Sequence, residues 1–171
     1  MDEINIYIAT TGKGPGRQHI AGTFLIEFIV SGQPITTELG SKGTYVYSDS
    51  STAQRVTVNL LTRAVSILPQ MMRRYIHDPP ERVKVWIDEQ ASSPFINRWY
   101  ETWAHNGYIK STGQAIENAM QWEDLNGAIS KSGMQYDYST IHHSYTNVMH
   151  EEASRILSEN SKKSPDTGGG G

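Results

Sequence analysis

The pattern that decides the fold lies in residues 83–125, which read VKVWIDEQASSPFINRWYETWAHNGYIKSTGQAIENAMQWEDL. In residues 83–87, branched apolar side chains alternate with others, which predicts a strand with one buried face. Asp88 follows where this alternation ends. Ser93-Pro94 is a typical helix start, because proline is tolerated at the first helical position, and Asn106-Gly107 is a typical stop. The stretch therefore predicts a strand that ends in a carboxylate and is followed by helices.

The flanking segments extend this order of strands and helices. Strands are predicted at 4–9, 19–30, 35–47, 83–87 and 134–138, and helices at 53–68, after Ser93, before Gly133 and at 146–157. The first three strands are separated by turns rich in Gly and Pro, so we expect them to pair antiparallel. Residues 71–75 either extend the first helix past Pro69 or form a short second piece. The order predicts one α/β domain.

Composition limits the class of protein. The 171 residues suit a single domain, and the formal net charge of −3 does not indicate a polyanion-binding protein. The absence of cysteine excludes disulfides, thiolate metal ligands and a cysteine nucleophile. There is no signal-peptide pattern or bilayer-spanning apolar run, so we expect a cytoplasmic or otherwise intracellular protein with no membrane contact. We expect the domain to comprise residues 1–157 and the Ser, Lys and Gly-rich residues 158–171 to be a disordered tail.

The central stretch resembles ribonuclease HI. That family has a strand ending in Asp, a Gln two positions later, a helix with two tryptophans one turn apart, and then a fixed series of glycine, aromatic, asparagine and tryptophan residues. The matching residues here are Asp88, Gln90, Trp99, Trp103, Gly107, Tyr108, Gly113, Ile116, Asn118, Trp122 and Leu125. The family also keeps a His in the loop before its last helix, where His142 and His143 stand. The resemblance implies a ribonuclease H-like α/β fold, with a five-stranded mixed sheet of three antiparallel and then two parallel strands, flanked by helices.

The resemblance also identifies the positions at which catalytic carboxylates are expected. Enzymes of this family hold two divalent cations between four carboxylates, and this charge is needed because two such ions about 4 Å apart repel each other. The first-strand Asp falls on Ala9, or on Thr10 if the register slips by one. The Glu of the long helix falls on Thr57 and the Asp of the last helix on Ser154, which leaves only Asp88. The resemblance therefore implies a degenerate catalytic centre.

Residual metal binding at Asp88 is the alternative. Glu151 lies one turn before Ser154 and could join Asp88, with His142 nearby, to hold one hydrated Mg²⁺. Such a site would make the protein an unorthodox metal-dependent ribonuclease H, whereas otherwise no cofactor is expected. The simpler interpretation is that Asp88 forms the turn after its strand. The adjacent residues His142 and His143 should point in opposite directions, which does not favour a shared metal.

Ring side chains are dense along one predicted helix and its exit. Trp99, Tyr100, Trp103 and Tyr108 are consistent with packing in the core or with a protein-binding surface, because interfaces are enriched in Trp and Tyr. The interface interpretation predicts that Tyr100 and Tyr108 are exposed.

The cations of the same region are few. Arg98 and Lys110 are balanced by Glu101 and Glu117, so this region should bind an RNA–DNA hybrid or duplex only weakly. A second group of cations, which forms either a patch elsewhere or ordinary solvated surface, consists of Arg73, Arg74, Arg82 and Lys84.

The sequence therefore favours an inactive ribonuclease H-like module that acts as a binding or assembly subunit in a nucleic-acid-handling complex, with a protein partner. The alternatives are a nuclease with a residual site and a purely structural subunit. The link to nucleic acid rests on the resemblance in fold.

Overall fold

A computed structural model describes residues 1–13 and 19–162. Its six-stranded sheet has the order β3-β2-β1-β5-β6, with β4 also paired to β2. The strands are β1 (Glu3–Lys13), β2 (His19–Val30), β3 (Gln33–Thr36), β4 (Tyr45–Ser48), β5 (Arg82–Trp86) and β6 (Gln135–Ser139). Neighbours of β2 are antiparallel to it, whereas β5 is parallel to β1 and β6 is parallel to β5. The predicted mixed sheet of antiparallel and then parallel strands is confirmed.

The predicted third strand at 35–47 is two strands, β3 and β4, and this adds the sixth strand to the five expected. Gly40 and Gly43 have φ of 84° and 89°, which turns the chain away from the sheet between them. The turn still serves β2, because Phe24 N donates to Thr44 O at 2.9 Å and Ile26 N donates to Thr37 Oγ1 at 3.0 Å. The edge of β2 therefore keeps its hydrogen bonds where the partner strand is interrupted.

Five α-helices and a short 3₁₀ turn join and cover the strands in the described residues. They are α1 (Ala53–Tyr75), the turn η2 (Glu89–Ala91), α2 (Ser93–Ile96), α3 (Trp99–His105), α4 (Ala119–Ser132) and α5 (Thr146–Lys162). Thr52 Oγ1 caps α1 by accepting from Arg55 N at 3.2 Å, and α1 continues through Pro69 to Tyr75. The predicted helix after Ser93 is interrupted at Arg98, whose φ of 56° separates α2 from α3.

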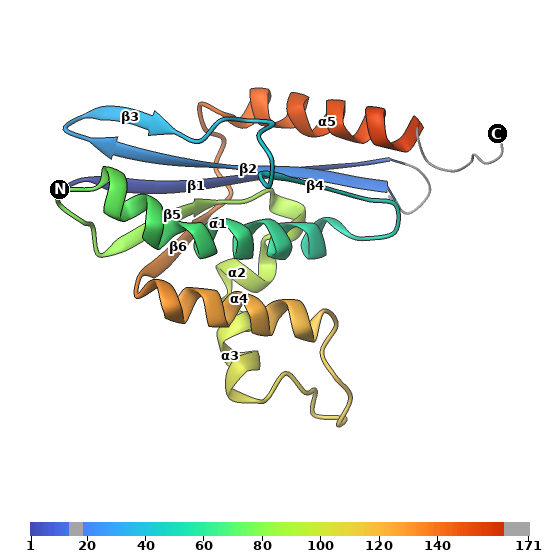
Figure 1. The fold of residues 1–171 in the computed structure, drawn as a ribbon. Coiled ribbons are helices and arrows are strands. Elements are labelled where there is room, and N and C mark those ends of the chain that lie inside the picture. The colour runs from blue at the N-terminus through green and yellow to red at the C-terminus, as the bar shows by residue number, and fades with distance from the viewer. Residues whose placement is uncertain (14–18, 163–171) are drawn as a thin grey trace.

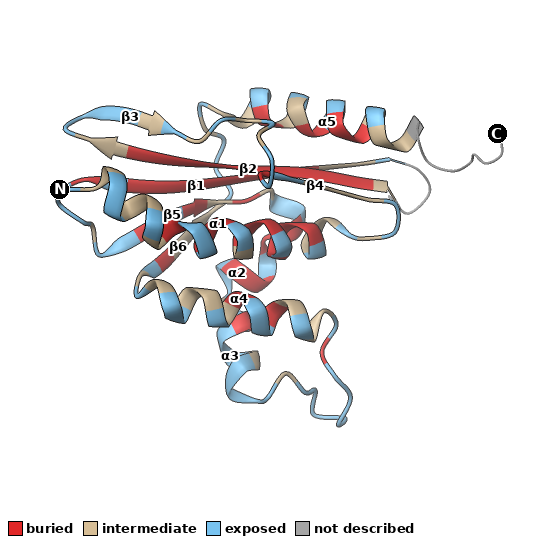
Figure 2. Ribbon diagram, viewed as in Figure 1, coloured by how far each residue is buried: buried red, intermediate tan, exposed pale blue. Residues whose placement is uncertain are grey.

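The elements form three layers (Figure 1), with α5 on one face of the sheet and α1 and α4 on the other. Successive side chains of β1 point to opposite faces of the sheet. Ile4, Ile6 and Ile8 join the large core under α1, whereas Tyr7 and Ala9 pack with Met149 of α5. Figure 2 shows the buried residues concentrated in the sheet and on the inner side of α1. Helix α3 and residues 106–118 form a lobe on the side of α4 away from the sheet.

The predicted start of the tail is wrong by at least five residues, because α5 continues through residues 158–162. Arg155 supports this last part of the helix by donating to Glu152 at 2.6 Å and to Glu159 at 2.8 Å. The remaining tail residues, 163–171, lie outside the described residues. Within the described helices, no segment has the length and apolar character needed to cross a membrane.

Candidate functional site

Asp88 lies just beyond β5, beside the end of β1. Thr10 N donates to Asp88 Oδ2 at 2.8 Å, and Thr10 Oγ1 lies 3.4 Å from the same oxygen. The register pairs Tyr7 with Trp86, so counting two residues onward places Ala9 beside Asp88. Ala9 and Asp88 are therefore neighbours, although β1 continues to Lys13, beyond the end at residue 9 expected from the sequence. The Asp88 side chain is only 16% exposed. The hydrogen bond from Thr10 N stabilises its carboxylate in this partly buried position.

His150 of α5 contacts the same carboxylate. Its Nε2 lies 3.1 Å from Asp88 Oδ1 and 3.2 Å from Oδ2, and its Nδ1 lies 2.9 Å from the carbonyl oxygen of Thr146. A carbonyl and a carboxylate both accept hydrogen bonds, so each ring nitrogen of His150 faces an acceptor to which it can donate. His150 therefore connects Asp88 to the first turn of α5.

A groove of about 270 Å³ opens beside this pair. It lies between η2 and the loop that joins β6 to α5, and its titratable lining residues are Asp88, Glu89, His142, His143 and His150. Tyr145 N donates to His143 Nδ1 at 3.2 Å, so this nitrogen acts as an acceptor. Burial, with His142 as the next cause, lowers the pKa of His143 to about 4. The groove therefore contains a neutral imidazole close to the pair between His150 and Asp88.

The wall of the groove is held in place by the buried carboxylate of Glu27 on β2. Its Oε1 accepts from Asn5 Nδ2 at 2.9 Å and from Tyr7 OH at 3.1 Å, and its Oε2 accepts from Tyr145 OH at 2.6 Å. Burial and then the bond to Glu27 raise the pKa of Tyr145 to about 12. The Tyr7 ring packs against His143 at a tilt of 40°, with centroids 4.4 Å apart. The sequence analysis missed this cluster, although a charged residue in the middle of an apolar strand was a usable signal.

The other expected carboxylate positions hold groups that cannot bind a cation by charge. Ala9 is buried against Tyr7 and Met149, and Thr57 is buried on α1 with no hydrogen-bond partner for its hydroxyl in the described residues. Ser154 is exposed one turn beyond His150. Glu151 is also exposed, and it is His150 that contacts Asp88 from α5. That Glu151 could complete a site with Asp88 stays a prediction, and the contact present in the structure is the one from His150.

These residues do not fit the two-metal centre of ribonuclease H. Mg²⁺ requires several anionic oxygens, and two such ions need more than one carboxylate between them. Among the four expected positions only Asp88 carries a carboxylate, and both of its oxygens already face His150; Glu89 is the other acid that lines the groove in the described residues. In residues 1–13 and 19–162, no three His, Asp or Glu side chains are arranged to hold a metal ion.

The lobe residues proposed for binding divide into buried and exposed groups. Tyr100 is 1% exposed and its hydroxyl lies 2.6 Å from Tyr138 OH, so the prediction that Tyr100 presents its ring at the surface is wrong. Trp103 packs edge-on against Trp122 at 5.2 Å. Half-buried Tyr108 accepts from Asn126 Nδ2 at 2.9 Å. Trp99, at 46% exposure, remains as an exposed ring of the group.

Arg98, the other predicted contact residue, is occupied within the chain. Its Nε and Nη2 donate to the carboxylate of Glu101 at 2.9 and 2.8 Å, and its Nη1 donates to Tyr136 O at 3.0 Å. The hydrogen bond to Glu101 is the main cause of the raised pKa of Arg98. By donating to a carbonyl of β6, Arg98 also covers part of the sheet edge. Lys110 is exposed in the lobe, which leaves it as an available cation there.

The comparison with known proteins identifies the fold class. No sequence-family description matches the chain, and no curated protein matches it. The chain is similar to the solution structure of the RNase H domain of prototype foamy virus, with a TM-score of 0.57 and 13% identity over 94% of this chain and 95% of that one. It is also similar to LC11-RNase H1 in complex with an RNA/DNA hybrid, with a TM-score of 0.56 and 11% identity over 92% and 99% of the two chains.

A third similar structure is the foamy viral protease-reverse transcriptase with an RNA/DNA hybrid, with a TM-score of 0.58 and 11% identity. The match covers 90% of this chain and 19% of that one. At these identities the likeness establishes the fold, and the chain has a ribonuclease H-like fold.

Proposed function

We propose that this chain is a catalytically inactive ribonuclease H-fold module that serves as a binding subunit in a nucleic-acid-handling complex. The observation that carries the first half is the contact of His150 with both oxygens of Asp88. In a ribonuclease H this carboxylate would face a metal ion. Here the imidazole of His150 faces both oxygens, and Thr10 N donates a further hydrogen bond to Asp88 Oδ2.

The missing charge explains why a cation should not displace His150. Two divalent ions repel each other strongly at close range, and this repulsion is normally offset by several carboxylates. With Ala9, Thr57 and Ser154 at the other positions, a single Asp88 cannot offset it. The phosphodiester chemistry that depends on a metal-activated water therefore has no support at this centre.

The second half of the proposal, a role beside nucleic acid, is supported by the solved structures of similar fold that contain an RNA/DNA hybrid. A protein partner is supported by the lobe, where Trp99 and Ile109 are 46% and 50% exposed. Exposed apolar side chains of this size are common at protein interfaces.

A cleavage assay tests the inactive centre. Purified protein incubated with a labelled RNA–DNA hybrid and Mg²⁺ or Mn²⁺ should leave the hybrid intact. The matched control is Asp88→Asn, which removes the one retained carboxylate. Cleavage by the wild type that disappears in Asp88→Asn would instead favour the residual nuclease, for which the groove beside Asp88 is the supporting observation.

A further inference from the structure

Helix α1 carries an unbalanced set of exposed cations. Its 23 residues include four arginines and no Asp or Glu. All four arginines are exposed, as is Lys42 in the neighbouring turn. We call this set the α1 ridge; it consists of Lys42, Arg55, Arg63, Arg73 and Arg74.

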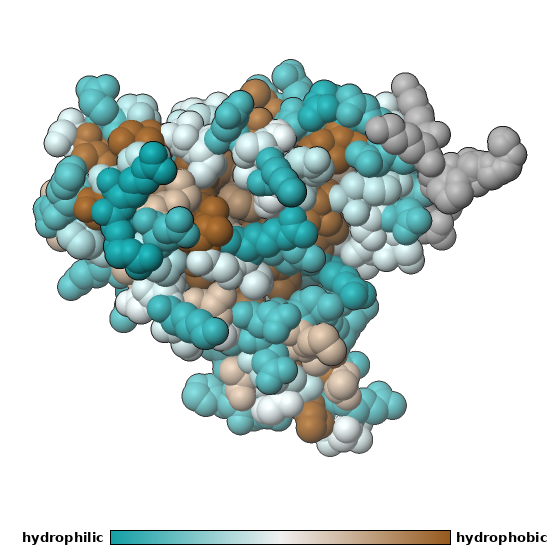
Figure 3. Space-filling view, viewed as in Figure 1, coloured by the Kyte–Doolittle hydropathy of each residue, from teal (hydrophilic) through white to brown (hydrophobic). Residues whose placement is uncertain are grey.

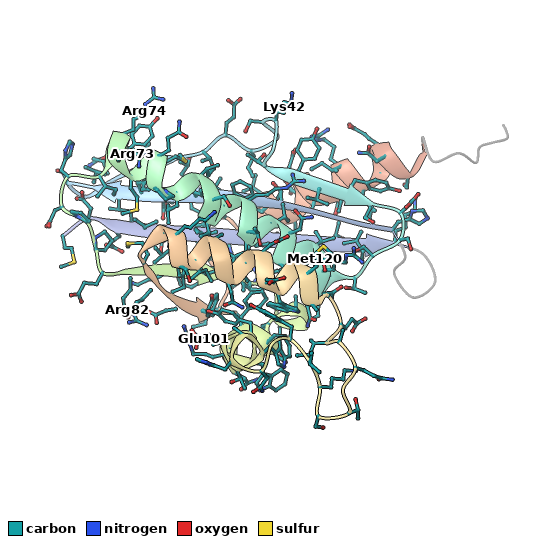
Figure 4. The ribbon with its side chains drawn as sticks, turned by 60° about the horizontal axis from the view of Figure 1, so that its bottom comes forward. Lys42, Arg73, Arg74, Arg82, Glu101 and Met120 are labelled. Atoms are coloured by element: carbon teal, nitrogen blue, oxygen red, sulfur yellow. The ribbon has the colours of Figure 1, made fainter. Side chains whose placement is uncertain are left out.

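The ridge follows the outer side of α1. Residues that face the sheet, such as Leu61, Val65 and Leu68, are fully buried, and the arginines lie on the opposite side of the helix. From Arg55 to Arg74 the helix rises about 28 Å, at 1.5 Å per residue. In Figure 4, Arg73 and Arg74 lie at one end of α1, and Lys42 lies on the same side of the molecule. The space-filling view in Figure 3 shows strongly hydrophilic residues spaced along α1.

The ridge cations form no ion pair in the part of the chain that the structure describes. Arg82, Arg98 and Arg155 pair with carboxylates, whereas within the described residues none of the ridge cations has a carboxylate within ion-pair distance. Arg73 and Arg82 are close in sequence, but Arg82 forms an ion pair with Asp137 whereas Arg73 is available to bind a ligand.

Arg63 is oriented by the backbone of the neighbouring turn. Its Nη1 donates to Tyr45 O at 3.1 Å and lies 3.5 Å from Gly43 O, and these contacts leave its other donors available. Arg63 and Lys42 line a pocket of about 570 Å³, together with the polar side chains of Asn59, Thr62, Ser66, Gln121 and Asp124. In the described residues Asp124 is the acid of this pocket, and Phe24 and Ile67 are its apolar lining residues. The pocket therefore combines one oriented cation, Arg63, and a second cation, Lys42, with hydrogen-bonding and apolar groups.

We infer that the α1 ridge binds the phosphate backbone of a nucleic-acid duplex without reading its sequence. Arginines interleaved with Asn, Ser and Thr are the side chains that contact phosphate and sugar in protein–nucleic acid complexes. Two aromatic rings adjoin the ridge: Tyr75 lies under Arg74, with the guanidinium carbon 5.4 Å from its centroid, and Tyr45 beside Arg63 is 38% exposed. The sequence of α1 between Arg55 and Arg74 has no aromatic residue, so there is no continuous series of rings for successive unpaired bases, and this favours a duplex over a single strand. The ridge lies on the face of the sheet opposite α5 and its contact with Asp88.

This inference rests on the nucleic-acid half of the proposed function and is independent of the inactive centre. In this arrangement the duplex contacts the outer face of α1, which is remote from Asp88. The lobe is nearly neutral and contributes little to the affinity for the duplex. Each neutralised phosphate releases counterions, so four or five ridge contacts imply a slope of log K against log salt of about −4.

Fluorescence anisotropy with a labelled DNA duplex tests the ridge, with KCl varied from about 50 to 200 mM. The ridge variant combines Arg63→Gln, Arg73→Gln and Arg74→Gln. The control variant combines Lys13→Gln, Lys84→Gln and Lys131→Gln, which changes the net charge equally on exposed residues elsewhere. The ridge variant should bind at least about 10-fold more weakly at low salt, with a slope reduced to about −2, and the control should keep the wild-type slope.

Equal losses of affinity in the two variants would overturn the inference, because duplex binding would then depend on net charge and not on the ridge. The absence of duplex binding by the wild type at about 50 mM KCl would overturn it as well. Labelled poly-glutamate is the competing probe: tighter binding of poly-glutamate than of any duplex at equal salt would assign the ridge to an acidic peptide and also overturn it. DNA, RNA and hybrid duplexes should bind within a few-fold of one another, and unchanged melting of all variants excludes misfolding. The cleavage assay on Asp88→Asn reports separately on the inactive centre.

Discussion

His150 Nε2 lies within 3.2 Å of both carboxylate oxygens of Asp88 and connects α5 to the end of β5. This pair places an imidazole against the one retained carboxylate of the four positions expected to be catalytic. It is partly exposed, with 38% of the His150 side chain and 16% of the Asp88 side chain accessible. Its contribution can be measured in stability and in metal binding.

The first prediction is that Asp88 and His150 are energetically coupled. A double-mutant cycle with Asp88→Asn and His150→Ala should give a coupling energy of about 1 kcal/mol, as expected for a partly exposed hydrogen-bonded pair. Urea denaturation of the four proteins provides the measurement. A coupling near zero would mean that the two side chains stabilise the fold independently and would remove the physical basis for the proposed inactive centre.

The second prediction concerns metal binding. Replacing His150 with Asp should place a second carboxylate beside Asp88, and this variant should be stabilised by Mn²⁺ or Mg²⁺ while the wild type is not. Thermal melting with and without the metal measures the difference. His142→Asp is the matched control, because His142 lines the same groove without contacting Asp88 in the described structure. Equal stabilisation of the wild type would contradict the proposal that His150 replaces the metal.

The fold was predictable because the central stretch combines a period-two strand, a terminal Asp and regularly placed tryptophans, features that depend on local sequence. Two errors arose where the backbone departs from regular geometry. Gly40 and Gly43 divide the third strand, and a single sequence does not show whether β2 then has one partner or two. The positive φ of Arg98 changes the helical phase, so Tyr100 is buried and Ile96 is 45% exposed.

The candidate site was less predictable than the fold. Asp88 was found because it ends a strand, whereas His150 lies in a helix whose rotation about its axis is set by packing of Met149 and Ala153. Sequence spacing alone did not show which neighbour of Met149 would reach Asp88. The rotation selects His150 and leaves Glu151 exposed.

The third prediction concerns the buried carboxylate of Glu27. Glu27→Gln should lower the free energy of unfolding by about 1–3 kcal/mol. The variant replaces one of the two accepting oxygens of Glu27 with an NH2 group, which cannot accept a hydrogen bond from Asn5, Tyr7 or Tyr145. Tyr145→Phe should cost about 1 kcal/mol by removing one of these bonds. Urea denaturation measures both, with exposed Glu38→Gln as the control. Wild-type stability in Glu27→Gln would mean that the cluster does not hold the groove wall.

The fourth prediction is a pH dependence at the N-terminus. Asp2 accepts from Asp78 N at 3.0 Å and from His77 N at 2.9 Å, and these bonds lower its pKa below the ordinary value of 3.8. A lowered folded-state pKa means that Asp2 contributes stability above its unfolded pKa and loses it as pH falls through the folded value. Asp2→Asn should therefore reduce stability at neutral pH and flatten the loss of stability below about pH 4. Parallel wild-type and variant curves from pH 7 to 2 would contradict this assignment.

The fifth prediction separates core from surface in the lobe. Tyr100 is 1% exposed, is bonded to Tyr138 and stacks on Trp122 with centroids 6.1 Å apart, so Tyr100→Ala should cost about 3–5 kcal/mol by leaving a cavity. Trp99 is 46% exposed, and Trp99→Ala should cost less than about 1 kcal/mol. Urea denaturation of the two variants measures the contrast between residues adjacent in the chain. Similar losses would show that Trp99 is also structural, and the lobe would then no longer support the proposed protein interface.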